Sequence, residues 1–452
     1  MTIRKKRFLY LYILMLALEL LIAGIILSRF GFDFYQGGDS PGYMLLAKNL
    51  VEHGTLSFGG DPLYPTNFRT PGYPLFLVLI YLIFHSFVPA IFFGALISAF
   101  AAPLVYLIAK EVFEERIAFV AGILAAVEPM SLFLGVSILT EGVFTPVLLL
   151  FAYCFIRYLK TTKSFYLWYS GALLGAATLI RPIMFYFWPF AILFILYREH
   201  IFGRRLVLKK IFVFIIIFFL VLSPWLIRNK ITVNSWQITG LQGYIFFVDH
   251  YGAVLRYLGE AGSLSDVQNK ALALVGPDKI FTSEGSDILF KTALNGIEQH
   301  KLAYLNIYAK SIISFFVANG YKLLFVDILG VPAQTPYVPF ELFLRFDFKS
   351  ILKIWDNVDF LGILIYWGSK IFWIVISSSF FVTLLLLLKN RYKNIRAQIL
   401  FLATVIIYFA VITGPTVINS GGRTKASING LIFIFFVFGI TRFFDYLKRK
   451  FV

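Results

Sequence analysis

The sequence predicts an all-α polytopic membrane protein with about ten transmembrane helices and a range of roughly eight to thirteen. Of its 452 residues, 59% are hydrophobic and only 14% are charged, and the mean hydropathy is +0.81. Several apolar runs reach the roughly 18 residues that a helix needs to cross a bilayer. Lysines and arginines gather at the ends of these runs, as they do in cytoplasmic loops.

The chain begins with the basic cluster Arg4-Lys5-Lys6-Arg7, and an apolar run from Phe8 to Leu27 follows. This run is long and has no clear small-residue cleavage site, so we expect an uncleaved first membrane helix. The basic cluster predicts that the N-terminus is cytoplasmic. The polar segment 29–74, which contains many Gly and Pro residues, is then the first outer loop.

The apolar stretch 74–109 is too long for one straight crossing, so we expect a short interfacial helix and then a crossing over 88–109. Further crossings are predicted at 117–133, 142–156, 166–179, 183–197 and 211–226. Basic residues predict that the connections around 157–163 and 198–210 are cytoplasmic. This assignment of sides, the parity of the spans, holds only if the stretch 74–109 makes an odd number of net crossings.

The segment 229–359 is predicted to be a second large outer loop, because it carries Gly, Ser, Asp and Glu residues that a span would not tolerate. Lys310 divides its most apolar part, Tyr304–Val317, which we interpret as an interfacial helix. A second such helix is expected between Phe340 and Trp355. The final crossings are predicted at 360–388, 397–413 and 428–444. The chain therefore divides into an N-terminal membrane module (1–228) that includes the first outer loop, an outer region (229–359) and C-terminal membrane helices (360–452).

The net charge of +17 does not indicate a nucleic-acid partner, because the basic residues border apolar runs and suit cytoplasmic loops and anionic membrane lipids. A single cysteine, Cys154, excludes an intramolecular disulfide and a thiolate metal cluster. The five histidines are scattered without the spacing of metal ligands. We therefore predict no metal site from histidine or cysteine.

The predicted topology places two acids and several cations at the outer face. These residues are Asp39, Arg69, Glu141, Arg181, Arg228, Lys310 and Arg423. Arginine and lysine neutralise phosphate oxygens, and a carboxylate can accept the proton of an attacking hydroxyl. Purely structural roles stay open for three of them. Glu141 could begin a helix, Arg228 could anchor a helix at the membrane boundary, and Lys310 could snorkel from an interfacial helix.

Five short motifs follow one another along the first half of the chain. They are Asp39-Ser40-Pro41-Gly42-Tyr43, Arg69-Thr70-Pro71-Gly72-Tyr73-Pro74, Leu139-Thr140-Glu141, Arg181-Pro182 and Ser223-Pro224-Trp225-Leu226-Ile227-Arg228. Their order and spacing, over about residues 5–230, resemble the membrane glycosyltransferases of the GT-C fold. Within that fold they are similar to the group around protein O-mannosyltransferases (glycosyltransferase family 39) and the aminoarabinose transferase of lipid A.

This resemblance implies an inverting transfer of a sugar from a polyprenyl-phosphate donor, such as undecaprenyl phosphate, to a hydroxyl of a lipid, glycan or protein. It implies Asp39 as the catalytic carboxylate, with the cations near the donor phosphate and Glu141, Tyr43 and Tyr73 in support. It also implies an active site on the outer face of a prokaryotic plasma membrane. Ser40 departs from the Asp-Glu pair of protein O-mannosyltransferases, which weakens a protein acceptor. No cofactor is required, and metal use, which varies among relatives, stays open.

Two other classes suit many membrane spans and basic residues. A transporter or flippase of lipid-linked sugars is one, although the sequence shows none of the internal repeats that are common in transporters. A polysaccharide polymerase or ligase is the other, although such enzymes usually hold their key residues in a late loop. A role for Asp39, in the first loop, would distinguish the glycosyltransferase from the polymerase.

Overall fold

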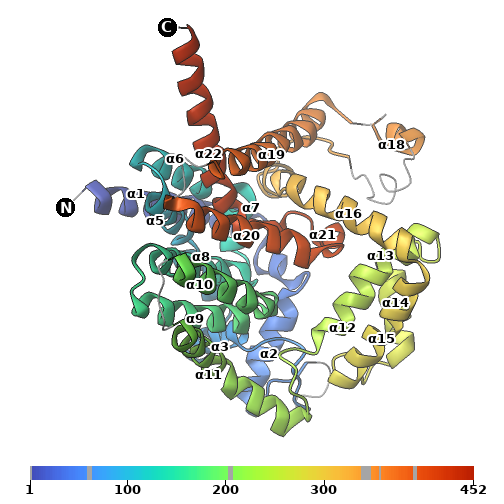
Figure 1. Ribbon diagram of the computed structural model, residues 1–452. Helices are drawn as coiled ribbons and strands as arrows, with labels where there is room; N and C mark the ends of the chain where they lie inside the picture. Colours follow the sequence, from blue (N-terminus) through green and yellow to red (C-terminus); the bar gives the residue numbers. More distant parts are fainter. Residues whose placement is uncertain are drawn as a thin grey trace.

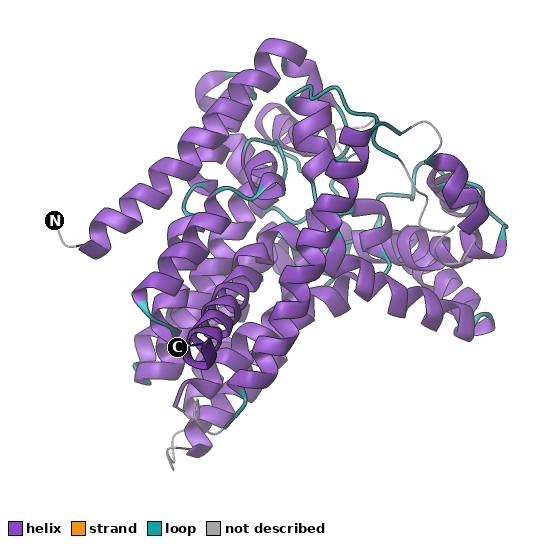
Figure 2. Cartoon of the chain, turned by 90° about the horizontal axis from the view of Figure 1, so that it is seen from above, coloured by secondary structure: helices purple, strands orange, loops and turns teal. Residues whose placement is uncertain are grey.

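The computed structural model describes residues 3–58, 64–201, 207–336, 348–355, 358–389 and 394–451. Within these ranges every regular element is a helix, as Figure 2 shows. The predicted all-α polytopic class is confirmed.

The helices of the first half are α1 (Ile3–Phe30), η1 (Phe32–Gln36), α2 (Ser40–His53), α3 (Gly72–Phe84), α4 (Val88–Ser98), α5 (Ala101–Val112), α6 (Glu115–Ala126), α7 (Pro129–Gly135), α8 (Glu141–Thr161), α9 (Ser164–Ile180), η2 (Pro182–Phe187), α10 (Trp188–Ile201) and α11 (Val207–Val233). Those of the second half are α12 (Leu241–Ile245), η3 (Phe246–Tyr251), α13 (Gly252–Leu258), α14 (Leu264–Val275), α15 (Ser283–Gln299), α16 (Lys301–Val317), η4 (Leu323–Ile328), α18 (Phe348–Ile354), α19 (Phe360–Leu387), α20 (Arg396–Thr413), α21 (Thr416–Ser420) and α22 (Arg423–Phe451).

Seven helical segments among the described residues are long and apolar enough to cross a membrane. They are α1, the continuous pair α4–α5, α8, α11, α19, α20 and α22. The bent pair α6 and α7 would make an eighth. The shorter helix α9 runs between the same two ends of the bundle as α8, because Arg181 and Tyr166 join it to α8 at both ends. The short helix α10 is joined to the Lys160 end of α8 by a hydrogen bond from Arg198. Counting these two, the number is compatible with about ten crossings.

Two predicted crossings differ in detail. The predicted span 117–133 is broken between Ala126 and Pro129 and bends by 60°. Pro129 cannot continue α6 because it lacks an N–H, and it begins α7 behind the N-cap Glu128, whose side chain accepts a hydrogen bond from the Ser131 N–H. The predicted span 183–197 begins instead as the 3₁₀ helix η2, and the α-helix starts only at Trp188.

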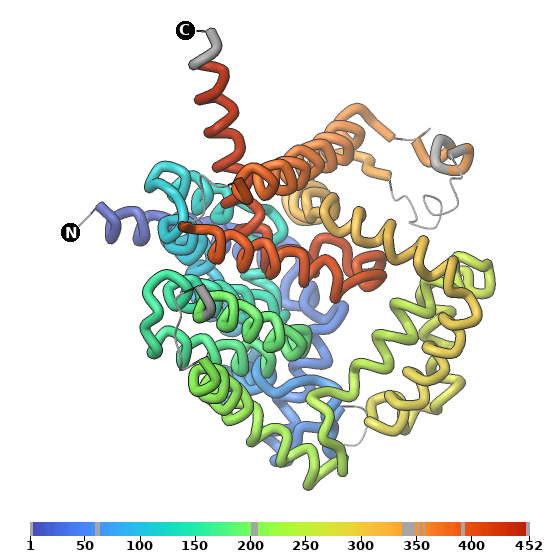
Figure 3. The backbone as a smooth tube through the Cα atoms, viewed as in Figure 1, coloured from blue at the N-terminus to red at the C-terminus, as the bar shows by residue number. Residues whose placement is uncertain are grey.

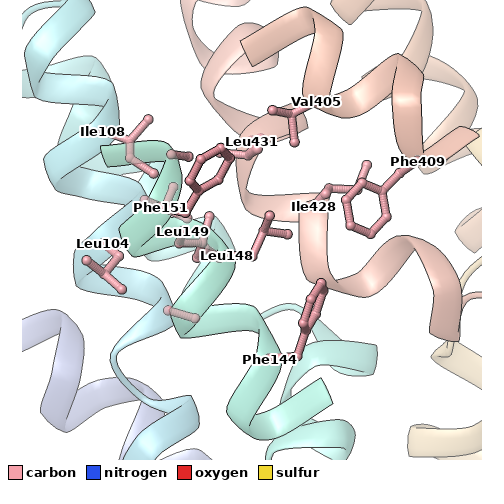
Figure 4. Close-up of a cluster of buried hydrophobic side chains, with 14 of the residues drawn as sticks. Leu104, Ile108, Phe144, Leu148, Leu149, Phe151, Val405, Phe409, Ile428 and Leu431 are labelled. Atoms are coloured by element: carbon pink, nitrogen blue, oxygen red, sulfur yellow. The ribbon is translucent and has the colours of Figure 1, made fainter. Parts of the chain in front are cut away.

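α8 lies at the centre of the main hydrophobic core (Figure 4). It carries Phe144, Leu148, Leu149 and Phe151, all of which are buried. Figure 4 shows them between Leu104 and Ile108 of α5, Val405 and Phe409 of α20, and Ile428 and Leu431 of α22. Because α5, α20 and α22 are far apart in the sequence, this packing fixes the first half of the chain against the last two spans.

The outer region forms a separate layer, in which α12 to α15 enclose a small core of their own. In Figure 1 this layer lies to the lower right, away from α8 to α10. Figure 3 shows both chain termini leaving the bundle away from this layer. The predicted interfacial helix 304–317 is the greater part of α16. Of the second, predicted between Phe340 and Trp355, the structure describes α18, whereas residues 340–347 lie outside the described ranges.

At the end of the bundle where α5 and α8 finish, basic residues come from the ends of three helices, α1, α5 and α8. Arg7 of α1 and Lys110 of α5 both pair with Glu115 at the start of α6. Arg157 and Lys160, near the end of α8, pair with Glu111 of α5. These are the ends that the charge distribution predicts to be cytoplasmic. The chain reaches this end at Lys110 after leaving the other end at Gly72, which agrees with the odd number of crossings that the parity requires.

Candidate active site

The first candidate residue, Asp39, lies where the first loop enters α2. Gly38 has a φ of 64°, a left-handed conformation that glycine adopts without steric cost, and Asp39 occupies the N-cap position of α2. Its side chain makes no capping hydrogen bond there. The carboxylate instead accepts a hydrogen bond from Arg69 Nη2 at 2.7 Å and another from Arg423 Nη1 at 2.7 Å. The Asp39 carboxylate therefore pairs with two arginines and does not cap α2.

Arg69 lies between α2 and α3 in the sequence, and an aromatic side chain from each of these helices helps to hold it in place. Its guanidinium lies 5.1 Å from the centre of the Tyr43 ring, and Nη1 donates to the Tyr43 hydroxyl at 3.5 Å. The Tyr73 ring packs edge-on against Tyr43, with their centres 5.1 Å apart. Tyr43 and Tyr73 are both buried, so they restrict where Arg69 can point.

Glu141 begins α8 and is the second carboxylate of the site. It accepts a hydrogen bond from Arg181 Nη1 at 2.7 Å and another from Arg423 Nε at 2.5 Å. Arg181 is the C-cap of α9, the helix antiparallel to α8, and Arg423 is the first residue of α22. The ends of three helices thus meet at one carboxylate.

We call the set Arg69, Asp39, Arg423, Glu141 and Arg181 the arginine–carboxylate network. Its arginines and carboxylates alternate, and Arg423 joins the two carboxylates. Three arginines and two carboxylates leave one net positive charge. The Asp39 side chain is 32% exposed and that of Glu141 only 1%, so a ligand from outside would meet the Asp39 side of the network first.

The pKa of Asp39 reflects its two cationic partners. Burial alone would raise the pKa of this carboxyl, but the charges and hydrogen bonds of Arg69 and Arg423 outweigh burial and lower it to about 2. Asp39 is therefore an anion at neutral pH and a weak base while both arginines are bound to it.

The segment 64–71, which precedes α3, holds Arg69 in place, and we call it the strap. Thr70 Oγ1 donates to the Ile180 carbonyl at the end of α9, and the Gly240 N–H donates to the Asn67 carbonyl. Gly72 follows directly, where a Cβ would lie 2.7 Å from the Leu179 carbonyl oxygen. Only glycine permits this close approach, which brings the residues at the end of the strap to the end of α9.

Two predicted site residues are not part of the network. Arg228 donates from Nη1 to the Thr66 carbonyl at 2.7 Å and from Nη2 to the Leu56 carbonyl at 3.3 Å. These contacts tie both halves of the first loop to the end of α11. Lys310 lies in the middle of α16, and the four ion pairs of the network do not include it. The structure therefore brings Asp39, Arg69, Glu141, Arg181 and Arg423 together and places Arg228 in support of the loop.

The structure also brings a residue to the site that sequence reasoning missed. Asp249 of η3 accepts a hydrogen bond from Asn419 Nδ2 at 2.6 Å, just before Arg423 in the chain. Burial raises the pKa of Asp249 to about 6; the hydrogen bond from Asn419 opposes this rise, and the negative charge of Asp39 adds to it. The signal in the sequence was one acid within the run Tyr244-Ile-Phe-Phe-Val-Asp249-His-Tyr251.

The donor set gives no support for a metal ion at this site. The Asp39 and Glu141 carboxylates both accept hydrogen bonds from two guanidinium groups. In the described ranges no group of three or more His, Cys, Asp or Glu side chains is arranged to hold an ion. We therefore derive no chemical step through a metal.

Part of the sequence is similar to a known protein family. A sequence model of the family described as dolichyl-phosphate-mannose-protein mannosyltransferase matches residues 68–227. This segment contains Arg69, Glu141 and Arg181. No protein of curated function matches the chain significantly by sequence.

Solved structures show a distant likeness. The archaeal oligosaccharyltransferase AglB from Archaeoglobus fulgidus, in complex with an inhibitory peptide and a dolichol-phosphate, is 15% identical and has a TM-score of 0.49. The match covers 96% of this chain and 51% of AglB, so the chain spans about half the length of that protein. ArnT from Cupriavidus metallidurans, bound to undecaprenyl phosphate, is 12% identical with a TM-score of 0.40, and the match covers 93% of this chain and 77% of ArnT. These likenesses assign no function.

The resemblance to the GT-C membrane glycosyltransferases, which the motifs of the first half predict, is thus confirmed by the family model over residues 68–227.

Proposed function

We propose that the protein is a membrane glycosyltransferase that moves a sugar from a polyprenyl-phosphate donor to a hydroxyl acceptor on the outer face of the membrane. The observation that carries the proposal is the arginine–carboxylate network at one end of the bundle, with a net charge of plus one. A lipid phosphate is an anion anchored at the bilayer boundary, and arginines bind its oxygens in pairs. The family matched by residues 68–227 supports the reaction class.

The donor phosphate would exchange partners with the carboxylates. Arg69 and Arg423 both pair with Asp39 at 2.7 Å, and their charges and hydrogen bonds lower its pKa. When phosphate oxygens take over these guanidinium groups, Asp39 loses its counter-charges and becomes a stronger base. Donor binding would therefore activate the carboxylate that the reaction needs.

Transfer then proceeds by one displacement at the anomeric carbon. The acceptor oxygen forms the new glycosidic bond while its proton passes to Asp39. The bond from the anomeric carbon to the phosphate oxygen breaks, and its electron pair stays on the polyprenyl phosphate. Arg69, Arg181 and Arg423 stabilise the developing charge on this leaving group. Attack opposite the leaving group inverts the anomeric configuration.

The first prediction concerns Asp39→Asn. This variant keeps the size of the side chain but removes the base, so we expect transfer to fall by about 10²–10⁴-fold, the usual contribution of a general base. Binding of undecaprenyl phosphate should persist, because Arg69 and Arg423 remain. Proteoliposomes supplied with a panel of undecaprenyl-phosphate sugars would report transfer as release of undecaprenyl phosphate.

Asp33→Asn is the matched control, because Asp33 is an exposed acid of the same loop. It should leave transfer unchanged. Full activity of Asp39→Asn would contradict the assigned base. Movement of the intact donor across the membrane without cleavage of the sugar bond would instead support a transporter.

A further inference from the structure

One ionisable side chain lies inside the first membrane helix and takes no part in the network. Glu19 of α1 is fully buried. Its helix is a candidate span from Ile3 to Phe30, so Glu19 lies well inside the apolar segment. An ionised carboxylate in such surroundings is costly unless a positive charge compensates it, and intramembrane acids of this kind usually have a function.

The other buried glutamates show how this chain normally meets that cost. Glu111 pairs with Arg157 and Lys160, Glu141 with Arg181 and Arg423, and Glu199 with Lys210 at 2.7 Å. Glu128 accepts hydrogen bonds from the backbone N–H and the hydroxyl of Ser131. The Glu19 carboxyl, by contrast, has no cationic partner and no well-formed hydrogen bond among the described residues, although the Ser98 hydroxyl lies close to it.

The Glu19 carboxyl packs closely against the ends of two other helices. Gly135 ends α7 directly beside it, and a Cβ at this position would collide with Glu19 Oε1. The same Cβ would lie 2.7 Å from the hydroxyl of Ser98, which ends α4. The side chain thus lies where α1, α4 and α7 meet, with one hydroxyl close by.

A small cavity lies next to Ser98 and Gly135, the two residues beside the Glu19 carboxyl, and Glu141 of the network also lines it. Its volume is about 10 Å³, enough for roughly one water molecule. Its polar lining comes from Ser98, Ser131, Thr145 and Glu141. Met15, one turn before Glu19 on the same face of α1, also lines it. Ser98 and Gly135, which lie beside the Glu19 carboxyl, therefore share this small and mostly apolar cavity with Glu141.

We propose that Glu19 is the binding site of one monovalent cation, a proton or a sodium ion, inside the membrane. The carboxylate needs a single positive charge, and the described parts of α1, α4 and α7 show no lysine or arginine paired with it. The oxygens available beside Glu19 are those of its own carboxyl and of the Ser98 hydroxyl, and oxygen ligands suit a proton or a hard cation. A bound cation would hold α7 against α1 directly behind Glu141.

The test compares wild-type protein with Glu19→Gln in proteoliposomes by infrared spectroscopy, in sodium buffer and in choline buffer at neutral pH. If a proton is bound, the wild type shows the C=O band of a neutral carboxylic acid in both buffers, and Glu19→Gln lacks it. If sodium is bound, this band appears in the wild type only when sodium is removed. Either result supports the site and identifies its occupant.

Two further variants separate the site from a general effect of substitution. Glu199→Gln is the matched control, because Glu199 is equally buried but paired with Lys210, so its replacement should remove no neutral-acid band. Gly135→Ala places a methyl group where the Glu19 carboxyl lies, and we expect it to shift or abolish the band. Each variant is compared at an equal yield of monomer, so that a folding defect is not read as loss of the site.

A dicyclohexylcarbodiimide reaction followed by mass spectrometry provides a second measurement. This reagent modifies protonated carboxyls in apolar surroundings, so the peptide that contains Glu19 should be labelled, and sodium should protect it only if sodium binds. The proposal is overturned if the wild type and Glu19→Gln give the same spectra in both buffers and Glu19 is not labelled.

Discussion

At the scale of single residues, Arg423 is the side chain of the network that binds both carboxylates. Its guanidinium donates from Nη1 to Asp39 and from Nε to Glu141, at 2.7 Å and 2.5 Å. The planar, forked guanidinium can serve two carboxylates in different directions, whereas an ammonium group is a single point of charge. Arg423 therefore sets the spacing between the exposed and the buried acid.

We expect Arg423→Lys to keep the charge and lose this geometry. A lysine would offer the donor phosphate a single point of charge in place of the forked guanidinium, and each charge-assisted hydrogen bond lost to the phosphate is worth about 1.5–3 kcal/mol, or roughly ten- to a hundredfold in binding. The affinity for undecaprenyl phosphate, measured on purified protein, should fall by at least about tenfold.

Arg442→Lys provides the comparison from the same helix. Arg442 reaches its acidic neighbours only at 3.5 Å and is 34% exposed, so its replacement should leave the affinity unchanged. Equal affinities of Arg423→Lys and the wild type would show that charge alone suffices at this position.

At the scale of elements, the site depends on helix ends held close together. The strap 64–71 carries Arg69, and hydrogen bonds join it to the ends of α9 and α11. α9 in turn ends at Arg181, which pairs with the start of α8. Small shifts between α3 and α9 would separate Arg69 from Arg181, although neither side chain is changed.

Gly72→Ala tests this coupling. Its Cβ would press against the Leu179 carbonyl and the Ile180 side chain, and overpacking of this kind costs about 1–3 kcal/mol. We expect a lower midpoint of thermal unfolding and weaker binding of undecaprenyl phosphate.

Gly24→Ala is the control within α1, because a Cβ there meets no atom within 4 Å. Alanine also favours a helix, so this variant should be neutral or slightly stabilising. If Gly72→Ala behaved in the same way, the close approach of α3 to α9 would be unimportant for the site.

At the scale of the whole molecule, the bundle has two chemically different ends. The network gathers the C-terminal end of α9 and the N-terminal ends of α8 and α22. The opposite end gathers Arg7, Lys110, Arg157 and Lys160 with Glu111 and Glu115. Because basic residues favour the cytoplasmic side, this polarity supports a network on the outer side.

Cysteine labelling of cells tests this orientation. Glu260→Cys, on the exposed outer layer, should react with a membrane-impermeant maleimide in intact cells, whereas Lys163→Cys should react only after permeabilisation. The native Cys154 is buried within α8 and should give little background. The reverse pattern would place the network in the cytosol and exclude an outer-face reaction.

The sequence by itself determined the class of the protein and most of the candidate site. Hydropathy and charge predicted the spans and the two large loops, because crossing a bilayer requires long apolar helices with basic cytoplasmic ends. The motifs singled out Asp39, Arg69, Glu141 and Arg181, and the predicted topology added Arg423; the structure brings these five residues together. Such residues can be predicted from the sequence because the type of each side chain and the spacing within each motif are local properties of the chain.

Only the tertiary structure decided how these residues pair. Asp39 and Arg423 are 384 positions apart, so no local pattern could show that they are hydrogen-bonded. For the same reason Arg228 resembled a phosphate ligand until its carbonyl partners were known, and Asp249 was not recognised as a neighbour of the site. In the sequence, Glu19 is a single acid within an apolar run. Whether a buried charge is compensated depends on helices that meet in space, and their packing, unlike their hydropathy, is not written in any single segment.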